Sequence, residues 1–487
     1  MNVLFSLLTG GAVPPLLLGS GVFFLVWLRG RPLTRPRGML RALTEKRPGG
    51  VSPFRALTQA LAGTLGVGNV VGVANAIAIG GAGAIFFMWV SALLAMILKY
   101  AEILLAVRHR ETLPDGSHTG GAALYLRAAF PRRHRAGAVP AVLFAALMVL
   151  NALTMGCVIQ VNAIADVFRG VQGVPVWVTA AVLVVLAVPV IPRGSRAVSA
   201  LTEYLVPIMS LGYVILAGAV LFLRREALPS AFAAIFREAF TARGAVGGAV
   251  GFLTSRALRV GTMRGLLSNE AGCGTAPTAH ACANTSSPAA QGVWGIFEVF
   301  VDTILLCTLT ALVILVNGEV AAPYAASPVM MTAAAFSATL GRGAAWFLSV
   351  AVLCFGYATV VCWADYGAAN LRFLGRRGER FKNVYYAVFA VCIPLGCTLA
   401  PGAVWAVSDI AMTALTAINL FGMVRLRKEV REETDRRFGL FQPKKGEQRN
   451  SRHGQDQART PGQEPAEQAA QTVQTERDAA KARGMVQ

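Results

Sequence analysis

A glycine-rich stretch near residue 66 holds the residues whose types are best suited to chemistry. It reads Gly63-Thr64-Leu65-Gly66-Val67-Gly68-Asn69. Glycine at this density weakens a helix and allows its backbone to open. An opened turn leaves amide groups that can bind a carboxylate, and carbonyl groups that can bind an ammonium group or a sodium ion. Because Thr64, Val67 and Asn69 are uncharged, this stretch suits a small zwitterion such as an amino acid.

A second glycine cluster lies in the other half of the chain. It consists of Gly244, Gly247, Gly248 and Gly251, and Phe252 follows it. With the first apolar segment set aside, the two clusters fall in the first and the sixth of ten apolar segments. Interruptions paired in this way are typical of the midplane binding site of a secondary transporter. Close packing of helices through small residues is the alternative explanation.

Ionisable residues within apolar segments are costly to bury, so each is a candidate for function. Lys99 and Glu102 are three residues apart, the spacing of an ion pair on one helix face. Glu298 and Asp302 are four apart, and either could bind a cation or a proton, or hydrogen-bond to a neighbouring helix. Asp365 could carry a proton or pair with an arginine.

Glu270 and His280 could form a catalytic pair by residue type, with the glutamate as a base. The sequence offers no nucleophile or metal-ligand spacing to accompany them. We therefore expect a protein that is not an enzyme, with no catalytic residue and no cofactor. Instead, we expect the Asn269–Pro277 loop to lie on the cytoplasmic side, where Glu270 and Arg264 would form the charge pair of an inner gate.

The elements that must position these residues are apolar segments. Of the 487 residues, 55% are hydrophobic and 14% are charged, whereas about 25% are charged in ordinary soluble domains. A helix needs roughly 20 apolar residues to cross a bilayer. Eleven segments qualify, at about 13–28, 52–79, 84–106, 138–168, 174–191, 200–223, 245–268, 290–316, 343–371, 384–399 and 403–424. The sequence therefore predicts an all-α polytopic membrane protein with eleven transmembrane helices, and a shorter re-entrant or interfacial helix at 328–340.

The distribution of the net charge of +20 along the chain indicates which loops lie on the cytoplasmic side of the membrane. Segments 29–50, 107–138, 372–382 and 425–487 hold 32 of the 45 basic residues and +18 of that charge. With eleven spans and the N-terminus outside, all four lie on the cytoplasmic side, as the positive-inside rule predicts. Loop 224–243 is a mild exception, because it is basic and predicted outside. We expect a multi-pass cell-membrane protein with a cytoplasmic C-terminus, whose partner is the lipid bilayer and not nucleic acid.

Three motifs carry a resemblance to a known family. They are Gly66-Val67-Gly68-Asn69-Val70-Val71-Gly72-Val73-Ala74-Asn75-Ala76-Ile77, Asn269-Glu270-Ala271-Gly272-Cys273-Gly274-Thr275-Ala276-Pro277, and Gln291-Gly292 with Phe300-Val301-Asp302-Thr303. Together they resemble the alanine/glycine:cation symporter family (sodium:alanine symporters) of the amino acid–polyamine–cation superfamily. The resemblance covers roughly residues 50–425.

This resemblance implies a LeuT-like core of two inverted five-helix repeats plus one extra N-terminal helix. The extra helix and a basic cytoplasmic linker would occupy residues 1–50. The first repeat would span 51–242 and the second 243–426. Residues 427–487 would form a cytoplasmic tail that is expected to be disordered, because it has few large apolar residues.

The resemblance also implies sodium-coupled import of alanine, glycine or a similar small neutral amino acid by alternating access. The substrate-binding residues that it implies are Thr64, Gly66, Val67, Gly68, Asn69, Gln160, Phe252 and Trp363. The sodium ligands that it implies are the carbonyl groups of Ala62 and Leu65 and the hydroxyl of Thr359. Sodium would be a co-transported ion and not a resident cofactor.

Several positions depart from the family's usual pattern, among them Val67, Ala358 and Asp365. They favour, as an alternative, a proton-coupled or differently selective amino-acid transporter on the same fold. A channel would need acidic rings or carbonyl filters, and a membrane enzyme would need a polar catalytic cluster, and the sequence suggests neither. Its Arg- and Ala-rich usage suggests a bacterium, and it indicates no particular oligomeric state.

Overall fold

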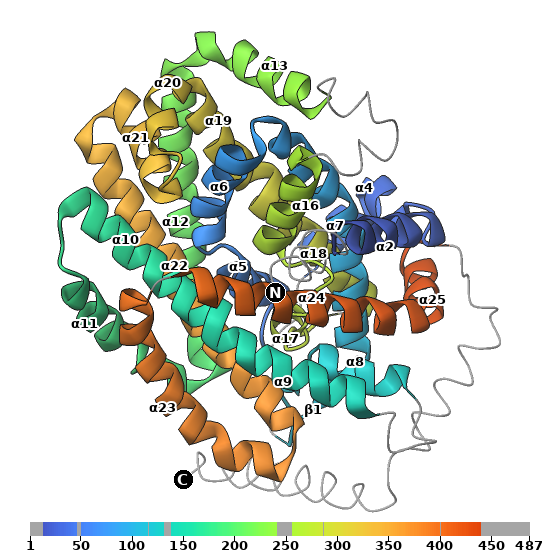
Figure 1. Cartoon of the computed structure of the whole chain (residues 1–487). Coiled ribbons are helices and arrows are strands. Elements are labelled where there is room, and N and C mark those ends of the chain that lie inside the picture. Colours follow the sequence, from blue (N-terminus) through green and yellow to red (C-terminus); the bar gives the residue numbers. More distant parts are fainter. Residues whose placement is uncertain are drawn as a thin grey trace, which may run out of the picture. The chain divides into compact units, whose positions relative to one another are not determined.

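The computed structural model describes residues 13–45, 50–114, 116–130, 138–240, 256–285, 287–399 and 401–439. These residues are almost entirely helical (Figure 1). Among them, strands β1 (Glu111–Thr112) and β2 (His118–Thr119) form a short antiparallel hairpin. The glycine cluster at 244–251 and Phe252 lie outside the described residues.

Eight helical segments of the described chain are long and apolar enough to cross a membrane, and one bent pair could add a ninth. The helices in the eight are α7 (Gly83–Arg108), α9 (Val139–Leu153) with η4 (Thr154–Ile159) and α10 (Gln160–Gln172), α11 (Val176–Ala187) with η5 (Ile191–Arg193), α12 (Ser195–Leu223), α18 (Pro288–Val299) with η7 (Phe300–Cys307) and α19 (Thr308–Val316), α22 (Arg342–Phe373), α23 (Arg376–Thr398) and α24 (Pro401–Arg425). The bent pair is α5 (Pro53–Thr64) followed by η2 (Val67–Asn69) and α6 (Val71–Gly80). Each of these coincides with an expected segment.

The two other expected segments correspond to shorter helices, α2 (Val13–Trp27) and α16 (Arg256–Asn269). The total of eleven spans therefore stays a prediction. The short helix expected at 328–340 is α21 (Pro328–Leu340). The remaining helices are α3 (Arg31–Thr34), α4 (Pro36–Thr44), α8 (Ala122–Ala129), η6 (Arg225–Ala227), α13 (Leu228–Ala239), α17 (Pro277–His280), α20 (Gly318–Ala321), η8 (Ala322–Tyr324) and α25 (Arg427–Arg437).

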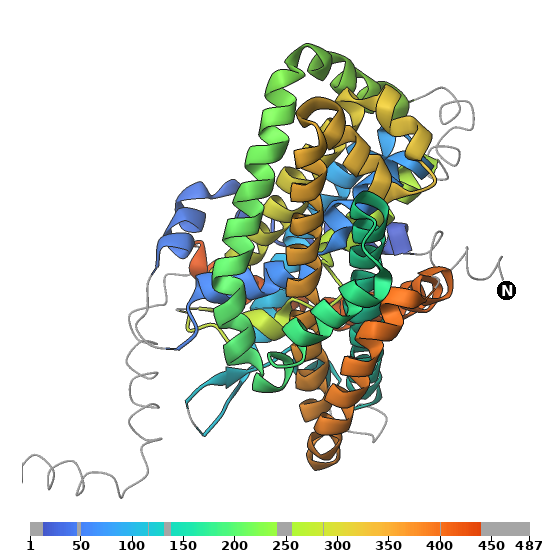
Figure 2. The same cartoon turned by 90° about the vertical axis from the view of Figure 1, so that its left-hand side faces the viewer.

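Helix α7 is the most enclosed of the long helices, and α16 and α18 pack along it. The α16 contact is close because residue 261 is a glycine. A Cβ atom there would lie 2.2 Å from the carbonyl oxygen of Ala84, so a larger residue would force the helices apart. On the other side of the fold, α12 and α22 run beside each other (Figure 1, Figure 2) and pack on α5.

The segment expected to be a disordered tail begins with an ordered helix, α25. It packs against α7 and α18. Arg108 at the end of α7 donates to Glu429 over 2.6 Å, and the buried hydroxyl of Tyr100 lies 2.9 Å from that of Thr434. Polar contacts of this kind order a helix that has few large apolar residues. The rest of the expected tail, residues 440–487, lies outside the described residues.

Candidate functional site

The predicted opening of the helix near residue 66 is confirmed. Helix α5 ends at Thr64, and the chain resumes in η2 with its axis bent by 63°. Gly66 connects the two parts with extended dihedral angles, φ −94° and ψ −155°. Open backbone of this kind is tolerated within a membrane only where protein or a water-filled cavity surrounds it. The groups that surround this turn are therefore the first candidates for function.

Gly66 lies between two side chains from different helices. A Cβ atom on Gly66 would lie 2.6 Å from Gln160 Oε1 and 2.9 Å from Thr359 Oγ1, so only glycine fits. Gln160 Oε1 accepts a hydrogen bond of 3.0 Å from the amide of Val67. Thr359 Oγ1 donates one of 2.9 Å to the carbonyl of Ala62. The turn thus brings together a predicted substrate residue and a predicted sodium ligand.

A π-helical turn, η4, places Gln160. Its residues Thr154–Ile159 immediately precede Gln160, and the side-chain amide of Gln160 donates to the carbonyl of Met155 over 3.2 Å. Such turns insert one residue into a helix and are frequent at functional sites, because they redirect side chains and free backbone groups. Here the result is a fixed amide whose oxygen faces the opened turn.

A cavity of about 30 Å³ adjoins the turn. Its walls are Gly63, Thr64, Gly66, Val67, Gly68, Gly72, Met155, Ile159, Gln160, Arg264, Leu267, Ser268 and Glu270. Five predicted substrate-binding residues are among them, together with both predicted gate residues. Met155, Ile159, Leu267 and Ser268 were not expected. The first two lie in the π-helical turn η4 and the other two near the end of α16, and no local sequence signal marks them.

The remaining predicted residues lie close to this cavity or outside the described chain. Trp363 is fully buried, and its indole nitrogen donates to the carbonyl of Gly63 over 3.1 Å. Leu65 caps α5, and its amide donates to the carbonyl of Leu61 over 2.6 Å. Phe252 is not among the described residues, so its predicted role as a wall of the pocket remains a prediction.

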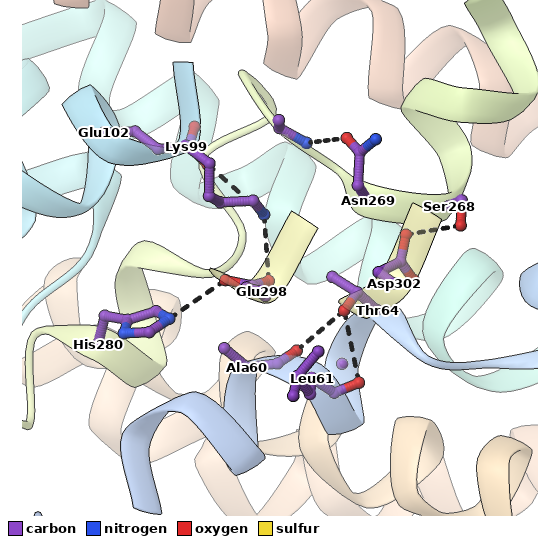
Figure 3. Close-up of polar contacts among 12 residues, drawn as sticks. Ala60, Leu61, Thr64, Lys99, Glu102, Ser268, Asn269, His280, Glu298 and Asp302 are labelled. Atoms are coloured by element: carbon purple, nitrogen blue, oxygen red, sulfur yellow. Dashed lines mark hydrogen bonds and ion pairs between the residues drawn. The ribbon is translucent and has the colours of Figure 1, made fainter. Parts of the chain in front are cut away.

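Asn69 turns toward a second polar cluster, around Asp302 in the π-helical turn η7. The amide of Asn69 donates to Asp302 Oδ1 over 2.8 Å. The hydroxyl of Ser268 donates to Asp302 Oδ2 over 2.7 Å (Figure 3). The hydroxyl of Thr303 donates to the same oxygen over 2.6 Å. Asp302 thereby joins the broken helix α5–α6 to the end of α16. Of the two roles considered for Asp302, this is hydrogen bonding to neighbouring helices.

A second interruption follows α16, at residues 270–276. Glu270, Gly272 and Gly274 all have positive φ there, and helix α17 resumes at Pro277. Glu270 is 2% exposed and lines the same cavity as Thr64. The Asn269–Pro277 segment is buried within the fold. Its expected place on the cytoplasmic side stays a prediction.

The carboxylate of Glu102 on α7 holds this second interruption in place. Its Oε2 accepts hydrogen bonds from the amides of Gly272 over 3.1 Å and Gly274 over 3.3 Å, and from Asn419 on α24 over 3.1 Å. Lys99 Nζ lies 3.7 Å from Glu102 Oε1, so the predicted ion pair on α7 is confirmed. Glu102 therefore does more than pair with Lys99 on one helix. Its carboxylate also accepts from the backbone amides of Gly272 and Gly274, which the interruption leaves without helical partners.

A larger cavity of about 820 Å³ lies near the N-terminal end of α5. Gln59 is in its wall, one turn before Gly63. The carboxylate of Asp365 accepts from Gln59 over 3.1 Å and from Ser195 over 2.8 Å, which joins α22, α5 and α12. Near the mouth, burial and then the charge of Arg110 lower the pKa of His118. His118 is therefore neutral at neutral pH.

Comparisons with known proteins agree with this geometry. A family model described as the sodium:alanine symporter family matches residues 1–452. An uncharacterized transporter of Haemophilus influenzae is 35% identical, over 89% of this chain and 94% of its own length. The sodium/alanine symporter AgcS of Methanococcus maripaludis is 33% identical, over 89% of this chain and 96% of its own length.

The fold also matches a solved structure, that of MhsT in complex with L-phenylalanine. The TM-score is 0.53 at 13% sequence identity, over 78% of this chain and 90% of that chain. The predicted fold class, an all-α membrane protein with a LeuT-like core, is thereby confirmed. The relatives are transporters, so this protein is a multi-pass membrane transporter and not an enzyme. The chain belongs to the sodium:alanine symporter family.

Proposed function

We propose that this protein is a secondary-active symporter that imports alanine or glycine together with sodium, by alternating access. The observation that carries this proposal is the environment of Gly66. Its missing side chain leaves room for Gln160 on one side and Thr359 on the other. A group expected to hold substrate and a group expected to hold sodium therefore act on a single turn of backbone. The relative AgcS, named a sodium/alanine symporter, supports the choice of substrate and ion.

The amino acid would bind at the opened turn Thr64–Asn69. Its carboxylate and amine would meet the unpaired backbone groups there, with Gln160, Trp363 and Phe252 completing the pocket. The cavity of about 30 Å³ has neutral walls apart from Arg264 and Glu270, which supports a small neutral substrate. Because this space is small even for such a substrate, the walls must separate when it binds. That separation is the movement on which alternating access depends.

Sodium would bind between the carbonyl groups of Ala62 and Leu65 and the hydroxyl of Thr359. The hydroxyl of Thr359 lies 2.9 Å from the carbonyl oxygen of Ala62, and this proximity supports a shared role for the two groups. A cation there would hold the turn open and so complete the amino-acid site. Coupling follows because each ligand then stabilises the conformation that the other one needs.

The gate remains a proposal as well. Arg264 and Glu270 lie on the wall of the same cavity, and Arg264 also interacts electrostatically with Asp409 of α24. A charge pair between Arg264 and Glu270 would close the site in one conformation and separate in the other. Trp363 and Phe252 would occlude the bound amino acid.

We place the protein in a bacterial cell membrane, with the N-terminus outside and the C-terminus in the cytoplasm. The basic segments 29–50, 107–138 and 372–382 support this orientation. The two inverted repeats would span 51–242 and 243–426, and their broken helices would be α5–α6 and α16–α17.

Uptake of radiolabelled alanine into proteoliposomes tests the proposal. We expect accumulation when sodium is higher outside, and only equilibration when potassium replaces it. An acid-outside gradient without sodium distinguishes the proton-coupled alternative. If no small neutral amino acid accumulates with sodium, the proposed function is wrong.

A further inference from the structure

A buried cluster of charged side chains lies where α7, α17 and α18 meet. Lys99 and Glu102 on α7, His280 on α17 and Glu298 on α18 are each at most 1% exposed. Lys99 Nζ lies 3.3 Å from Glu298 Oε1 and 3.7 Å from Glu102 Oε1. His280 Nε2 lies 3.2 Å from Glu298 Oε2 (Figure 3). These four residues are called the α7–α17–α18 cluster below.

The charges of this cluster do not balance unless it holds a proton. Lys99 lies between two carboxylates of this cluster, Glu102 and Glu298; the nearby Glu270 shares its cavity wall with Arg264. With a neutral His280, the cluster would therefore keep one buried negative charge. Unpaired buried charges are very costly, and such groups take up protons instead. His280, which is hydrogen-bonded to Glu298, is placed to accept that proton.

His280 is built to accept a proton at little structural cost. Its Nδ1 lies 2.8 Å from Gln291 Nε2, so a neutral ring accepts there and donates to Glu298 from Nε2. Gln291 Oε1 is buried and has no hydrogen-bond partner in the described residues. A half-turn of this amide would place Oε1 against Nδ1–H. A protonated ring would then donate to Glu298 and Gln291 at once.

We propose that His280 is a proton-binding site and that its protonation controls the second broken helix. The dependence of transport on it rests on the symporter function proposed above. The proton comes from water in the 820 Å³ cavity, whose wall includes Cys282, two residues after His280. It adds to the ring at Nδ1, and the rotation of Gln291 accompanies that step.

The effect of this protonation reaches the substrate site through Lys99. With His280 neutral, Lys99 is shared between Glu298 and Glu102. A protonated His280 neutralises Glu298, so Lys99 moves toward Glu102. Glu102 holds the amides of Gly272 and Gly274, next to Glu270 on the cavity wall. A change of charge at His280 therefore changes how firmly the opened backbone is held.

The surroundings of His280 contain further titratable and charged groups. Directly after His280, the carbonyl groups of Ala281 and Ala283 accept from Arg110. α17 packs against α5, α7 and α22, and is hydrogen-bonded to α18. Several titratable groups on these elements have a polar partner: Arg55 pairs with Glu203, Arg108 with Glu429 and Glu433, Tyr100 with Thr434, Asp365 with Gln59 and Ser195, and Arg372 with Glu379. The other titratable groups on α22 are Arg342 at its exposed start, Cys354, Tyr357, Cys362 and Tyr366. Those on α7 and α18 are Lys99, Glu102 and Glu298 of the cluster itself. Glu270 and Cys273 lie in the intervening backbone.

Solid-state NMR of the full chain in lipid bilayers tests the proton site directly. With ¹⁵N-labelled histidine, the ring signals that disappear in His280→Gln belong to His280. We expect them to change from one protonated nitrogen to two between about pH 8.5 and about pH 5.5. Gln291→Glu should keep the second proton bound to higher pH, because a carboxylate is a stronger acceptor. If the His280 signals do not change over this range, the proposal is wrong.

Alanine uptake by proteoliposomes provides the second readout. In the wild type, the sodium-driven rate should differ at least threefold between those two pH values, and in His280→Gln it should be the same at both. His109→Gln is the matched control, because His109 pairs with Glu429 at the partly exposed end of α7 and should keep the wild-type profile. An unaltered profile in His280→Gln contradicts the link to transport. If the wild type transports nothing, the proposed function fails, while the NMR result still decides the proton site.

Discussion

Gly66 is important because it has no side chain. The two groups beside it, Gln160 Oε1 and Thr359 Oγ1, occupy the space of a side chain. Gln160 satisfies the amide of Val67, and Thr359 satisfies the carbonyl of Ala62. Both hydrogen bonds to the opened turn can therefore form only if residue 66 has no Cβ atom. A change at this position reaches both proposed ligand sites at once.

Gly66→Ala should reduce sodium-driven alanine uptake at least tenfold while leaving the protein folded in the membrane. The added methyl group would lie 2.6 Å from one oxygen and 2.9 Å from the other, so both must move. Gly218→Ala is the matched control, because a Cβ there meets nothing within 4 Å. Normal uptake by Gly66→Ala would contradict the shared-turn arrangement.

Thr359→Val should raise the sodium concentration needed for half-maximal uptake about tenfold, with a similar rate at saturating sodium. The substitution keeps the volume of the side chain and removes one oxygen ligand, for which a loss of about 1.4 kcal/mol is reasonable. Uptake is measured against sodium at fixed alanine. Thr413→Val serves for comparison, because that hydroxyl donates to the carbonyl of Asp409 in its own helix. An unchanged sodium dependence would remove Thr359 from the proposed site.

Individual site residues were predictable to very different degrees. The glycine-rich stretch pointed to the opened turn by itself, since glycine density has a direct effect on helix stability. Gln160 and Thr359 came only from the resemblance, because nothing in their own neighbourhood marks them. The role of Glu102 could not be predicted, since its partners Gly272 and Gly274 are about 170 residues away in the chain.

At the scale of elements, α5 is held at two levels. Near Gly63 it is bonded to Trp363 of α22, and one turn earlier Gln59 is bonded to Asp365. Asp365 also accepts from Ser195 at the start of α12. Gly63 lines the small cavity and Gln59 lines the large one, so α5 contributes to the walls of both. Movement of α5 away from α12 and α22 would connect the two cavities.

Asp365→Asn should loosen this contact, because a neutral amide replaces a charged acceptor of two hydrogen bonds. The native Cys362 can report it, since its thiol lies 3.0 Å from the carbonyl of Gln59 and is buried. In a variant that keeps only this cysteine, labelling by a water-soluble maleimide should become about tenfold faster. Asp166→Asn, which breaks an exposed pair with Arg169, should leave the labelling rate unchanged. Equal rates in all three proteins would argue against the contact as a barrier.

The long helices were predictable because a span needs a continuous apolar segment, and this pattern is local. The second interruption was less so. Glycine density predicts an interruption at 244–251, which lies outside the described residues, and it does not predict the one that the described chain has at 270–276. The residues there, Asn269 to Pro277, are typical of a helix end. Only tertiary packing against Glu102 shows that this end lies within the fold.

At the scale of the molecule, α25 connects parts of the chain that are far apart in sequence. Arg31 pairs with Asp435, Arg108 with Glu429 and Glu433, and Tyr100 shares a hydrogen bond with Thr434. Exposed ion pairs contribute little singly. Several of them around a buried hydroxyl pair contribute more, because the removal of one partner leaves a buried polar group unsatisfied.

A chain ending at residue 426 should therefore unfold several degrees below one ending at residue 439. The longer chain keeps α25 and is the baseline, so the difference measures this helix alone. Thermal unfolding in detergent is followed by the fluorescence of a thiol-reactive dye. Equal midpoints for the two chains would show that α25 adds nothing to stability.

The buried position of Lys99 and Glu102 also bears on how the protein is made. Each charge costs about 2.5–3.5 kcal/mol at the centre of an isolated membrane helix. Glu298, the second partner of Lys99, and the amides of Gly272 and Gly274 that donate to Glu102 are synthesised about 170 to 200 residues later. During synthesis α7 therefore has only an internal pair to offset its charges, and it gains its full partners when α17 and α18 arrive. The contacts that hold the charges of this early helix are thus completed only when later segments of the chain have been made.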